Sequence, residues 1–294
     1  EENAWFGAQH VGSRLALCNF ELDLLDSARR IDTGRTLGEH IAEAGFDVGP
    51  LRRRERYLAA DRINAFIELH IEQGPVLESR EIPIGIVTDI RGNLRCSDCV
   101  CVGAYDHSGT VPREMRKDAV MAAAELVADM ERLWETWLAD EKDLVLTFGQ
   151  FSTDRDAHSI TTIPGEVRFS FDARSHSSAV LAALKSELLR RAEKIGRRRG
   201  VAFRFGRFSQ GEPAPMADTL RRRLAAGATE LDMPFLEMPS GAGHDAADFA
   251  LAGVPTAMIF VRNANGSHNP AEAMRMEDFA VGVELLLWLL TRPD

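Results

Sequence analysis

The apolar pattern between residues 88 and 207 constrains the fold of this chain more than any other feature. Two segments, 118–137 and 180–195, predict helices because apolar side chains recur in them at helical spacing. Strand-like alternation of apolar and polar residues occurs in four further segments, namely 94–102, 144–151, 167–173 and 201–208. The order of strand, helix, strand, strand, helix and strand predicts a compact α+β unit of ferredoxin-like type, with two helices on one face of an antiparallel sheet.

Segments on both sides of this unit mix helices with buried strands. Strand-like composition recurs in FIELHI, IGIVTDI and TAMIFV, at residues 66–71, 84–90 and 256–261. VGVELLLWLL at 281–290 predicts a packed amphipathic helix. Two flanking pieces around a self-contained unit predict an insertion. We therefore expect an α/β domain made of residues 1–87 and 208–294, interrupted by a separate domain of residues 88–207.

The charge balance excludes some classes of partner. The 294 residues include 35 basic and 45 acidic side chains, which give a formal net charge of −10 at pH 7. This balance argues against a nucleic acid or an anionic membrane surface as the main partner. A small anionic substrate remains compatible with it, because one well-placed arginine can outweigh distant carboxylates. No stretch reaches the roughly 18 apolar residues that a membrane span needs, and no secretory signal is visible.

Cysteine usage indicates the compartment. The four cysteines fit a reducing compartment better than a disulfide framework, which predicts a cytoplasmic protein. Three of them lie in CSDCVC at 96–101, a cluster that would be compatible with zinc. No second ligand pair follows at a suitable spacing, and the stretch reads as a strand, whose successive side chains alternate between faces. We therefore interpret this cluster as structural.

Several short segments carry side chains suited to catalysis. The adjacent carboxylates Glu1 and Glu2 can divide metal coordination and proton transfer between them, although such pairs are also common on surfaces. His70 ends an apolar strand just before a Gly-Pro turn, where a ring is held rigidly yet can face a cleft. A strand histidine is also often a satisfied core residue. His244 in SGAGHD and His268 in GSHNPAE lie in small-residue loops that suit either metal ligands or plain turns.

Two further segments suit the binding of anions. His107 lies in a loop rich in Gly, Ser and Thr before the helix predicted at 118–137, and backbone N–H groups at a helix start favour an anion or a developing oxyanion. A capped helix with a polar loop is the alternative. Arg174 ends the strand after the IPG turn and could clamp a carboxylate, although exposed arginines are common. The chain has no G-x-S-x-G elbow and no P-loop, so a metal-activated water is favoured over a serine or thiol nucleophile.

Taken together and in this order, six segments resemble one family. EE…FG…GSR, FIELHIEQGPVLE, GAYDHSGTVP…R.DA, IPGEVRFSFDAR, SGAGHDA and NGSHNPAE are similar to the metal-dependent N-carbamoyl-L-amino-acid hydrolase, β-ureidopropionase and allantoate amidohydrolase branch of the aminoacylase/carboxypeptidase-like superfamily. The resemblance spans the whole chain, and ELHIEQGP and SHNPAE are its specific segments. It implies a di-metal α/β catalytic domain interrupted by a lid and dimerisation domain, and hence a homodimer.

The resemblance also implies the metal chemistry. Glu1 would be the general base, Glu2 and His268 would be ligands of one metal, and His70 would be a ligand of the other. Zinc or manganese would fill the sites, with cobalt or nickel as alternatives. The peptidase branch usually has a carboxylate at the position of His70, so histidine there favours carbamoyl substrates over peptides.

The remaining implied roles concern the substrate. His107 would stabilise the oxyanion in the active site of the partner subunit, and Arg174 would bind the substrate carboxylate. Gln73 and the loop of Gly243 and His244 would shape the pocket. The expected reaction is hydrolysis of a ureido or amide carbon–nitrogen bond in a small carboxylate-bearing molecule such as an N-carbamoyl amino acid or allantoate.

Two departures from the family pattern affect these expectations. Family members carry a His-x-Asp motif and a metal-bridging Asp upstream of the Glu pair, where this chain begins, so we expect the chain as it stands to bind metals poorly and to be inactive. Thr161 stands where the family commonly has a substrate-binding Asn, which puts the usual substrate in question. The alternatives are a dipeptidase or aminoacylase of the same superfamily, and a non-catalytic dimeric protein that binds a ligand.

Overall fold

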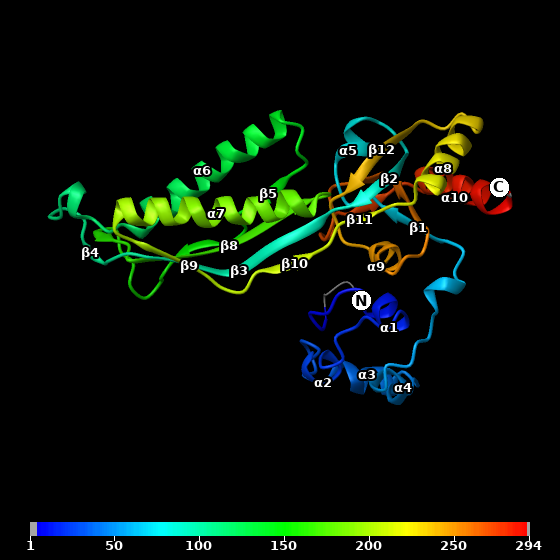
Figure 1. Cartoon of the computed structure of the whole chain (residues 1–294), viewed down its shortest axis with the longest axis horizontal. Coiled ribbons are helices and arrows are strands. Elements are labelled where there is room, and N and C mark those ends of the chain that lie inside the picture. The colour runs from blue at the N-terminus through cyan, green and yellow to red at the C-terminus, as the bar shows by residue number, and fades with distance from the viewer. Residues whose placement is uncertain (1–4, 293–294) are drawn as a thin grey trace. The chain divides into compact units, whose positions relative to one another are not determined.

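The computed structural model describes residues 5–292, and the chain divides into two compact units. The first unit comprises the residues up to Ile90 together with those from Ala214 onward, and the second comprises Arg91–Pro213 (Figure 1). These limits lie slightly later in the sequence than the expected limits at 87/88 and 207/208. The second unit extends to Pro213 because β10 (Ser209–Gly211) pairs with β3 (Gly92–Val102).

A mixed sheet forms the centre of the first unit. Its order is β1 (Phe66–Ile71), β13 (Thr256–Val261), β2 (Ile84–Ile90) and β11 (Ala214–Pro215), and β12 (Phe235–Ser240) also pairs with β2. β1 runs parallel to β13, whereas β2 runs antiparallel to it. Every residue of β13 is buried, because helices cover both faces of the sheet.

The two faces of this sheet pack against different helices. Met258 and Phe260 face a core that includes α5 (Val76–Ser79) and α9 (Asp245–Leu251). The alternate residues of β13, Ala257 and Ile259, face a core built with α8 (Asp218–Glu230) and α10 (Met276–Thr291). The alternation follows from the two-residue period of a strand. α10 contains the helix predicted at 281–290.

Short helices make up the N-terminal part of the first unit. They are α1 (Val11–Ala16), α2 (Leu24–Ser27), α3 (Leu37–Glu43), α4 (Val48–Arg52) and a 3₁₀ turn at Ala60–Arg62. A small core around Phe20, Leu25 and Leu37 holds the four α-helices together. α3 begins with a capping box, in which Thr36 and Glu39 satisfy each other's backbone N–H groups.

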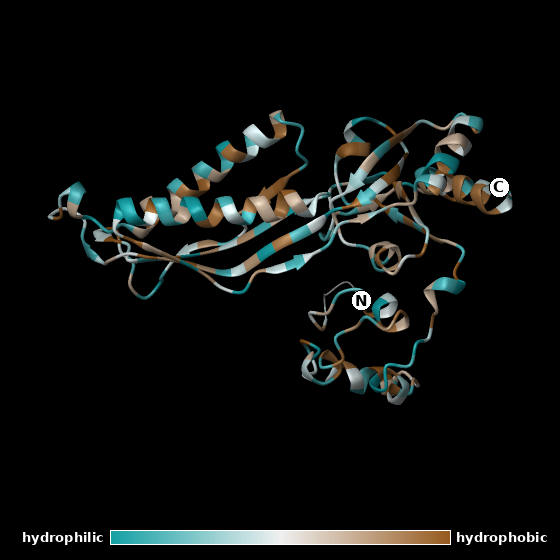
Figure 2. Cartoon of the chain, in the orientation of Figure 1, coloured by the Kyte–Doolittle hydropathy of each residue, from teal (hydrophilic) through white to brown (hydrophobic). Residues whose placement is uncertain are grey.

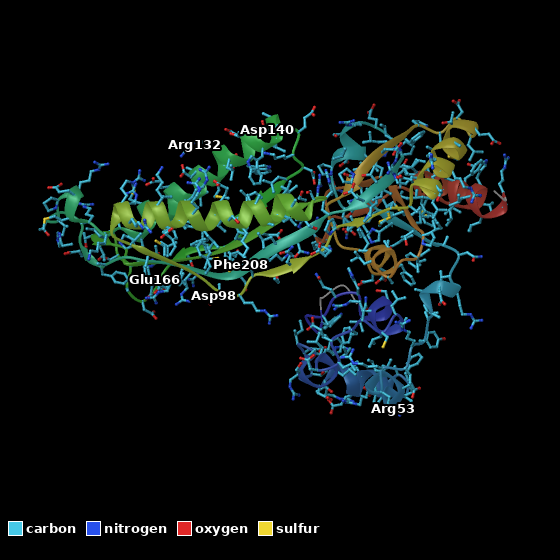
Figure 3. All side chains as sticks on the ribbon, in the orientation of Figure 1. Arg53, Asp98, Arg132, Asp140, Glu166 and Phe208 are labelled. Atoms are coloured by element: carbon cyan, nitrogen blue, oxygen red, sulfur yellow. The ribbon has the colours of Figure 1, made fainter. Side chains whose placement is uncertain are left out.

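The second unit is an antiparallel sheet with two long helices on one face (Figure 1). β3 and β8 (Glu166–Ser175) form its centre, and β5 (Val145–Thr147), β6 (Phe151–Thr153) and β9 (Ala202–Phe205) flank them. α6 (Ala119–Ala139) and α7 (Ser178–Arg199) are the predicted helices, capped by the side chains of Asp118 and Ser177. Figure 2 shows apolar bands recurring between polar ones along both helices, and Asp140 lies at the exposed end of α6 (Figure 3).

Two details of the second unit correct the sequence analysis. The strand expected at 144–151 is in fact the two short strands β5 and β6. The cysteine cluster does not alternate between faces, because a bulge between Cys96 and Cys99 turns Cys96, Cys99 and Cys101 into the same core. Their thiols are free, and no cysteine belongs to a group of metal-ligand type within residues 5–292.

The remaining strands are two-residue pairs that shape loops. β4 (Asp106–His107) pairs with β7 (Thr162–Ile163), and β14 (Asn263–Ala264) pairs with β15 (Ala273–Met274). A 3₁₀ turn at Arg113–Met115 precedes α6. Within the part of the chain that the structure describes, no helix is both long and apolar enough to cross a membrane.

Candidate active site

Candidate residues gather where β1 and β13 end side by side. The two strands are parallel neighbours, with His70 beside Phe260 and Ile71 beside Val261. The loops that follow them therefore leave the sheet at the same edge, which is where α/β folds place their sites. Gln73 comes from the first of these loops and His268 from the second.

The His70 ring is oriented by its own backbone. Its Nδ1–H donates to the carbonyl of Ile71 at 2.7 Å. This bond assigns the proton to Nδ1 and makes Nε2 the nitrogen that a metal would take. A histidine that ends a strand in this way is rigid, as the sequence analysis expected for a ligand.

His244 lies next to His70 and is almost fully buried. The ring centroids of the two histidines are 4.6 Å apart. The Ser240 hydroxyl donates to the Ala242 carbonyl, so it accepts a hydrogen bond from Nε2–H of His244 at 2.9 Å. Burial lowers the pKa of His244 to about 3, and the charges of His70 and His10 add to this effect. The imidazole is therefore neutral at physiological pH, with the lone pair on Nδ1.

Glu68 completes this group, and the sequence analysis did not single it out. Its Oε1 lies 3.9 Å from Nδ1 of His244, and its Oε2 accepts from the Ala246 N–H at 2.8 Å. Burial raises the pKa of the Glu68 carboxyl. Ligand-type atoms of Glu68, His70 and His244 all lie within 4.8 Å of one another, a donor set that could hold a metal ion. The signal was present in the sequence, because residues two apart on a strand face the same side.

Gln73 and His268 meet in the lining of one pocket. Nε2 of Gln73 lies 3.3 Å from Nε2 of His268. The backbone N–H of His268 donates to Glu272 at 3.0 Å. The pocket has a volume of about 410 Å³, and its lining includes His70, Gln73, Val261, His268, Glu272 and Phe279. The structure thus brings together three of the expected site residues, His70, Gln73 and His268, around one cavity.

His107 and Thr161 are neighbours in the second unit. β4 and β7 place His107 opposite Thr162, and the Ser108 N–H donates to the Thr161 carbonyl at 2.9 Å. The Gly109 N–H donates to Nδ1 of His107 at 3.0 Å. A neutral His107 therefore carries its proton on Nε2, and the side chain is exposed.

Arg174 lies in the six-stranded sheet, near the end of β8 that is remote from the β4–β7 pair. Its Nε donates to Asp172 at 3.0 Å, and the same carboxylate accepts from Arg95 at 2.7 Å. β8 separates Arg174 from the β4–β7 pair by roughly 25 Å, at about 3.4 Å per strand residue. A single copy of the second unit therefore keeps Arg174 and His107 far apart. Glu1, the expected general base, and Glu2, an expected metal ligand, lie outside the described residues.

The GSR segment and the GHDA segment meet in the first unit. The Ser13 hydroxyl donates to Asp245 at 2.5 Å, and Nδ1 of His10 lies 2.7 Å from Asp248. The hydrogen bond to Asp248 raises the pKa of His10, against the effect of burial. Gly243 lies beside His10, because a Cβ at Gly243 would lie 3.4 Å from the His10 ring. These contacts hold α1 against the start of α9 and so support the loop that carries His244.

An α/β unit with histidines and carboxylates at the ends of parallel strands is the framework of a metal-dependent hydrolase. Residues 14–292 match the peptidase family M20/M25/M40, and the chain belongs to that family. Within it the chain falls among the amidohydrolases, which act on carbon–nitrogen bonds other than peptide bonds, so the family predicted from the sequence is confirmed.

Individual relatives support this assignment. The whole chain is 32% identical to an N-carbamoyl-L-amino acid amidohydrolase of Geobacillus stearothermophilus, of which it covers 70%. Over 78% of the chain it is 36% identical to an allantoate amidohydrolase of Escherichia coli K12, of which it covers 54%. An amidase of the hydantoinase/carbamoylase family from Burkholderia multivorans has a similar structure, with a TM-score of 0.87 and 29% identity over 99% of this chain and 67% of that one.

Proposed function

We propose that this chain hydrolyses a ureido or amide bond in a small carboxylate-bearing substrate, such as an N-carbamoyl amino acid or allantoate. The observation that carries the proposal is the pocket between the ends of β1 and β13, where His70, Gln73 and His268 meet. Its size suits a small molecule rather than a folded polypeptide. The names of the curated relatives supply the substrate class.

Two divalent metal ions are proposed as cofactors. Imidazoles and carboxylates on this edge of the sheet fit zinc or manganese, with cobalt or nickel as alternatives. His70 would hold one ion and His268 the other, with Glu2 as a further ligand and Glu1 as the general base. When bound, the metals would activate water and polarise the scissile carbonyl. The chain's own contribution is to fix the rings, as the Ile71 carbonyl does for His70.

Substrate binding is proposed for Arg174, Gln73 and the Gly243–His244 loop. Asp172 holds Nε of Arg174 and so orients a planar guanidinium that suits a carboxylate. Gln73 presents a carboxamide to the pocket, which suits a ureido group. Thr161 offers a hydroxyl in place of the carboxamide that the family commonly has there, so a Thr161→Asn variant should shift the substrate preference.

A homodimer through the second unit is part of the same proposal. Almost the whole length of β8 separates Arg174 from the β4–β7 pair that carries His107, so one copy of this unit cannot bring both to one small substrate. A second copy would supply His107, whose Nε2–H can donate to a developing oxyanion. The second unit would then serve as the lid and dimerisation domain, and the first as the catalytic domain. Free thiols at all four cysteines support a cytoplasmic location.

Metal content and substrate range test the proposal. Elemental analysis should be run on this chain and on the protein extended upstream through its natural gene, after incubation with manganese or zinc. About two metals per extended chain and turnover of carbamoyl substrates are expected, with few metals in this chain alone. His70→Ala should lose metal, whereas His158→Ala, on an exposed loop of the second unit, should not.

Three other outcomes are informative. No metal in either protein would refute the hydrolytic mechanism. Turnover of acyl or peptidyl substrates instead of carbamoyl ones would favour a dipeptidase or aminoacylase. Tight ligand binding without turnover in the metal-loaded extended protein would favour a non-catalytic dimeric protein.

A further inference from the structure

Asn263 is a buried polar side chain between the two loops of the candidate site. Its side chain is 2% exposed, and it lies in β14 just after β13 ends. The Gln73 N–H donates to its Oδ1 at 3.0 Å, and its Nδ2 donates to the Gly266 carbonyl at 2.9 Å. A backbone N–H can only donate and a carbonyl can only accept, so these partners fix the orientation of the carboxamide.

Both loops adopt backbone conformations that need support. Gln73 has φ of 59° and His268 also has φ of 59°, in the left-handed region that residues other than glycine seldom occupy. Asn263 bonds to Gln73 directly, and Gly266 lies two residues before His268. The main chain of Asn263 is itself fixed, because it pairs with Met274 in β15.

We infer that Asn263 is a positioning residue that sets the Gln73–His268 pair by joining its two loops. The inference rests on the proposed function in taking that pair as part of the active site. One carboxamide supplies the acceptor for the first loop and the donor for the second, and neither aspartate nor leucine of similar size can supply both. Asn263 is not itself one of the residues that line the pocket, and its hydrogen bond to Gln73 goes to the backbone N–H, so its effect passes through the backbone.

Three variants of the full chain test the inference. Asn263→Ala removes both bonds. Asn263→Asp keeps an acceptor for the Gln73 N–H but turns a carboxylate oxygen toward the Gly266 carbonyl. Asn64→Asp, at an exposed position, is the control for the added charge. Hydrogen exchange at the Gln73 amide measures how well the loop after β1 is held. The ¹⁵N chemical shifts of the His268 ring measure the same for the loop after β13.

The expected pattern separates positioning from general destabilisation. In Asn263→Ala the Gln73 amide should exchange at least tenfold faster and the His268 shifts should move. In Asn263→Asp the Gln73 amide should stay protected while the His268 shifts still move. In the extended protein, zinc affinity or kcat/KM should fall about 10- to 100-fold for Asn263→Ala, as for other residues that support metal ligands. Asn64→Asp should resemble the original chain in every readout.

Two results would overturn the inference. Unchanged exchange and unchanged His268 shifts in Asn263→Ala would show that the loops hold without this residue. Equal changes at both loops in Asn263→Asp, together with a general loss of protection, would show a purely structural role. If the extended protein hydrolyses none of the carbamoyl substrates while the two loop signals respond as expected, the proposed function fails and the positioning role of Asn263 stands.

Discussion

The Nε2 atoms of Gln73 and His268 lie 3.3 Å apart, although 195 positions separate the two residues in the sequence. The contact exists because β1 and β13 run parallel as neighbours and release their loops at one edge. A carboxamide NH₂ facing the ring requires a lone pair on Nε2 of His268.

Replacing Gln73 with leucine should impair the site with little effect on stability. The substitution keeps the size of the side chain but removes the amide that meets His268. We expect kcat/KM of the extended protein to fall about 10- to 100-fold, the usual range for residues that support ligands. The melting temperature should stay close to the original, because the side chain is only half-buried. Gln150→Leu, on an exposed loop of the second unit, is the matched control, and equal kinetics for the two variants would contradict the prediction.

Glu72 should matter for stability rather than chemistry. Its side chain is buried, and its two oxygens accept from the N–H groups of Val76 and Leu77 at 2.8 and 2.7 Å. Glu72→Ala would leave two backbone donors at the start of α5 without partners. We expect the free energy of unfolding in urea to fall by about 2–6 kcal/mol, from about 1–3 kcal/mol for each of the two unsatisfied groups. Glu78→Ala, exposed on the same helix, should cost far less, and similar losses for the two would refute the capping role.

Local pattern was enough to predict most elements of the fold. β2 and β13 span the residues expected for them, because their apolar runs are short and bounded by turn residues. α6 and α7 begin directly after Asp118 and Ser177, whose side chains cap them. The prediction of one strand at 144–151 failed because residues 148–150 leave the sheet between β5 and β6. Nothing in local alternation reveals that interruption.

The candidate site was less predictable, because it depends on which strands become neighbours. Motifs drew attention to His70 and His268, and only the pairing of β1 with β13 joins their loops. Glu68 was visible in principle, two residues before His70 on the same strand face. Asn263 was not, because its importance comes from two backbone groups distant in sequence. The inward turn of Cys99 was also hidden, since a bulge breaks the period on which the argument relied.

Asp143 should give the second unit an acid-sensitive contribution to stability. Burial alone would raise the pKa of this carboxyl, but hydrogen bonds from Arg91 and the His176 N–H outweigh it and hold the pKa below its usual value. The contribution is therefore complete above the unfolded pKa of about 3.9 and is lost as pH falls through the lower folded pKa. Asp143→Asn should lower the unfolding free energy by about 1–3 kcal/mol at pH 7 and flatten its fall below pH 4.

Urea unfolding at several pH values measures that contribution. Asp140→Asn is the control, because Asp140 is exposed at the end of α6 (Figure 3). In the control, the free energy of unfolding should decrease at low pH as much as in the original chain. If it also decreases by the same amount in Asp143→Asn, other carboxylates account for the acid sensitivity.

The pair of His10 and Asp248 should make the first unit more stable at low pH than at high pH. The hydrogen bond between His10 and Asp248 raises the pKa of His10 in the folded chain. The stabilisation is thus complete below the unfolded pKa of about 6.5 and is lost as pH rises through the folded pKa. Because both side chains are partly buried, we expect the free energy of unfolding to be about 1 kcal/mol higher at pH 5.5 than at pH 8.5. Asp248→Asn and His10→Gln should each remove this pH-dependent difference in unfolding free energy. The double variant should behave like either single variant, because one interaction underlies both effects. A pH dependence that survives in Asp248→Asn would assign it to a different group.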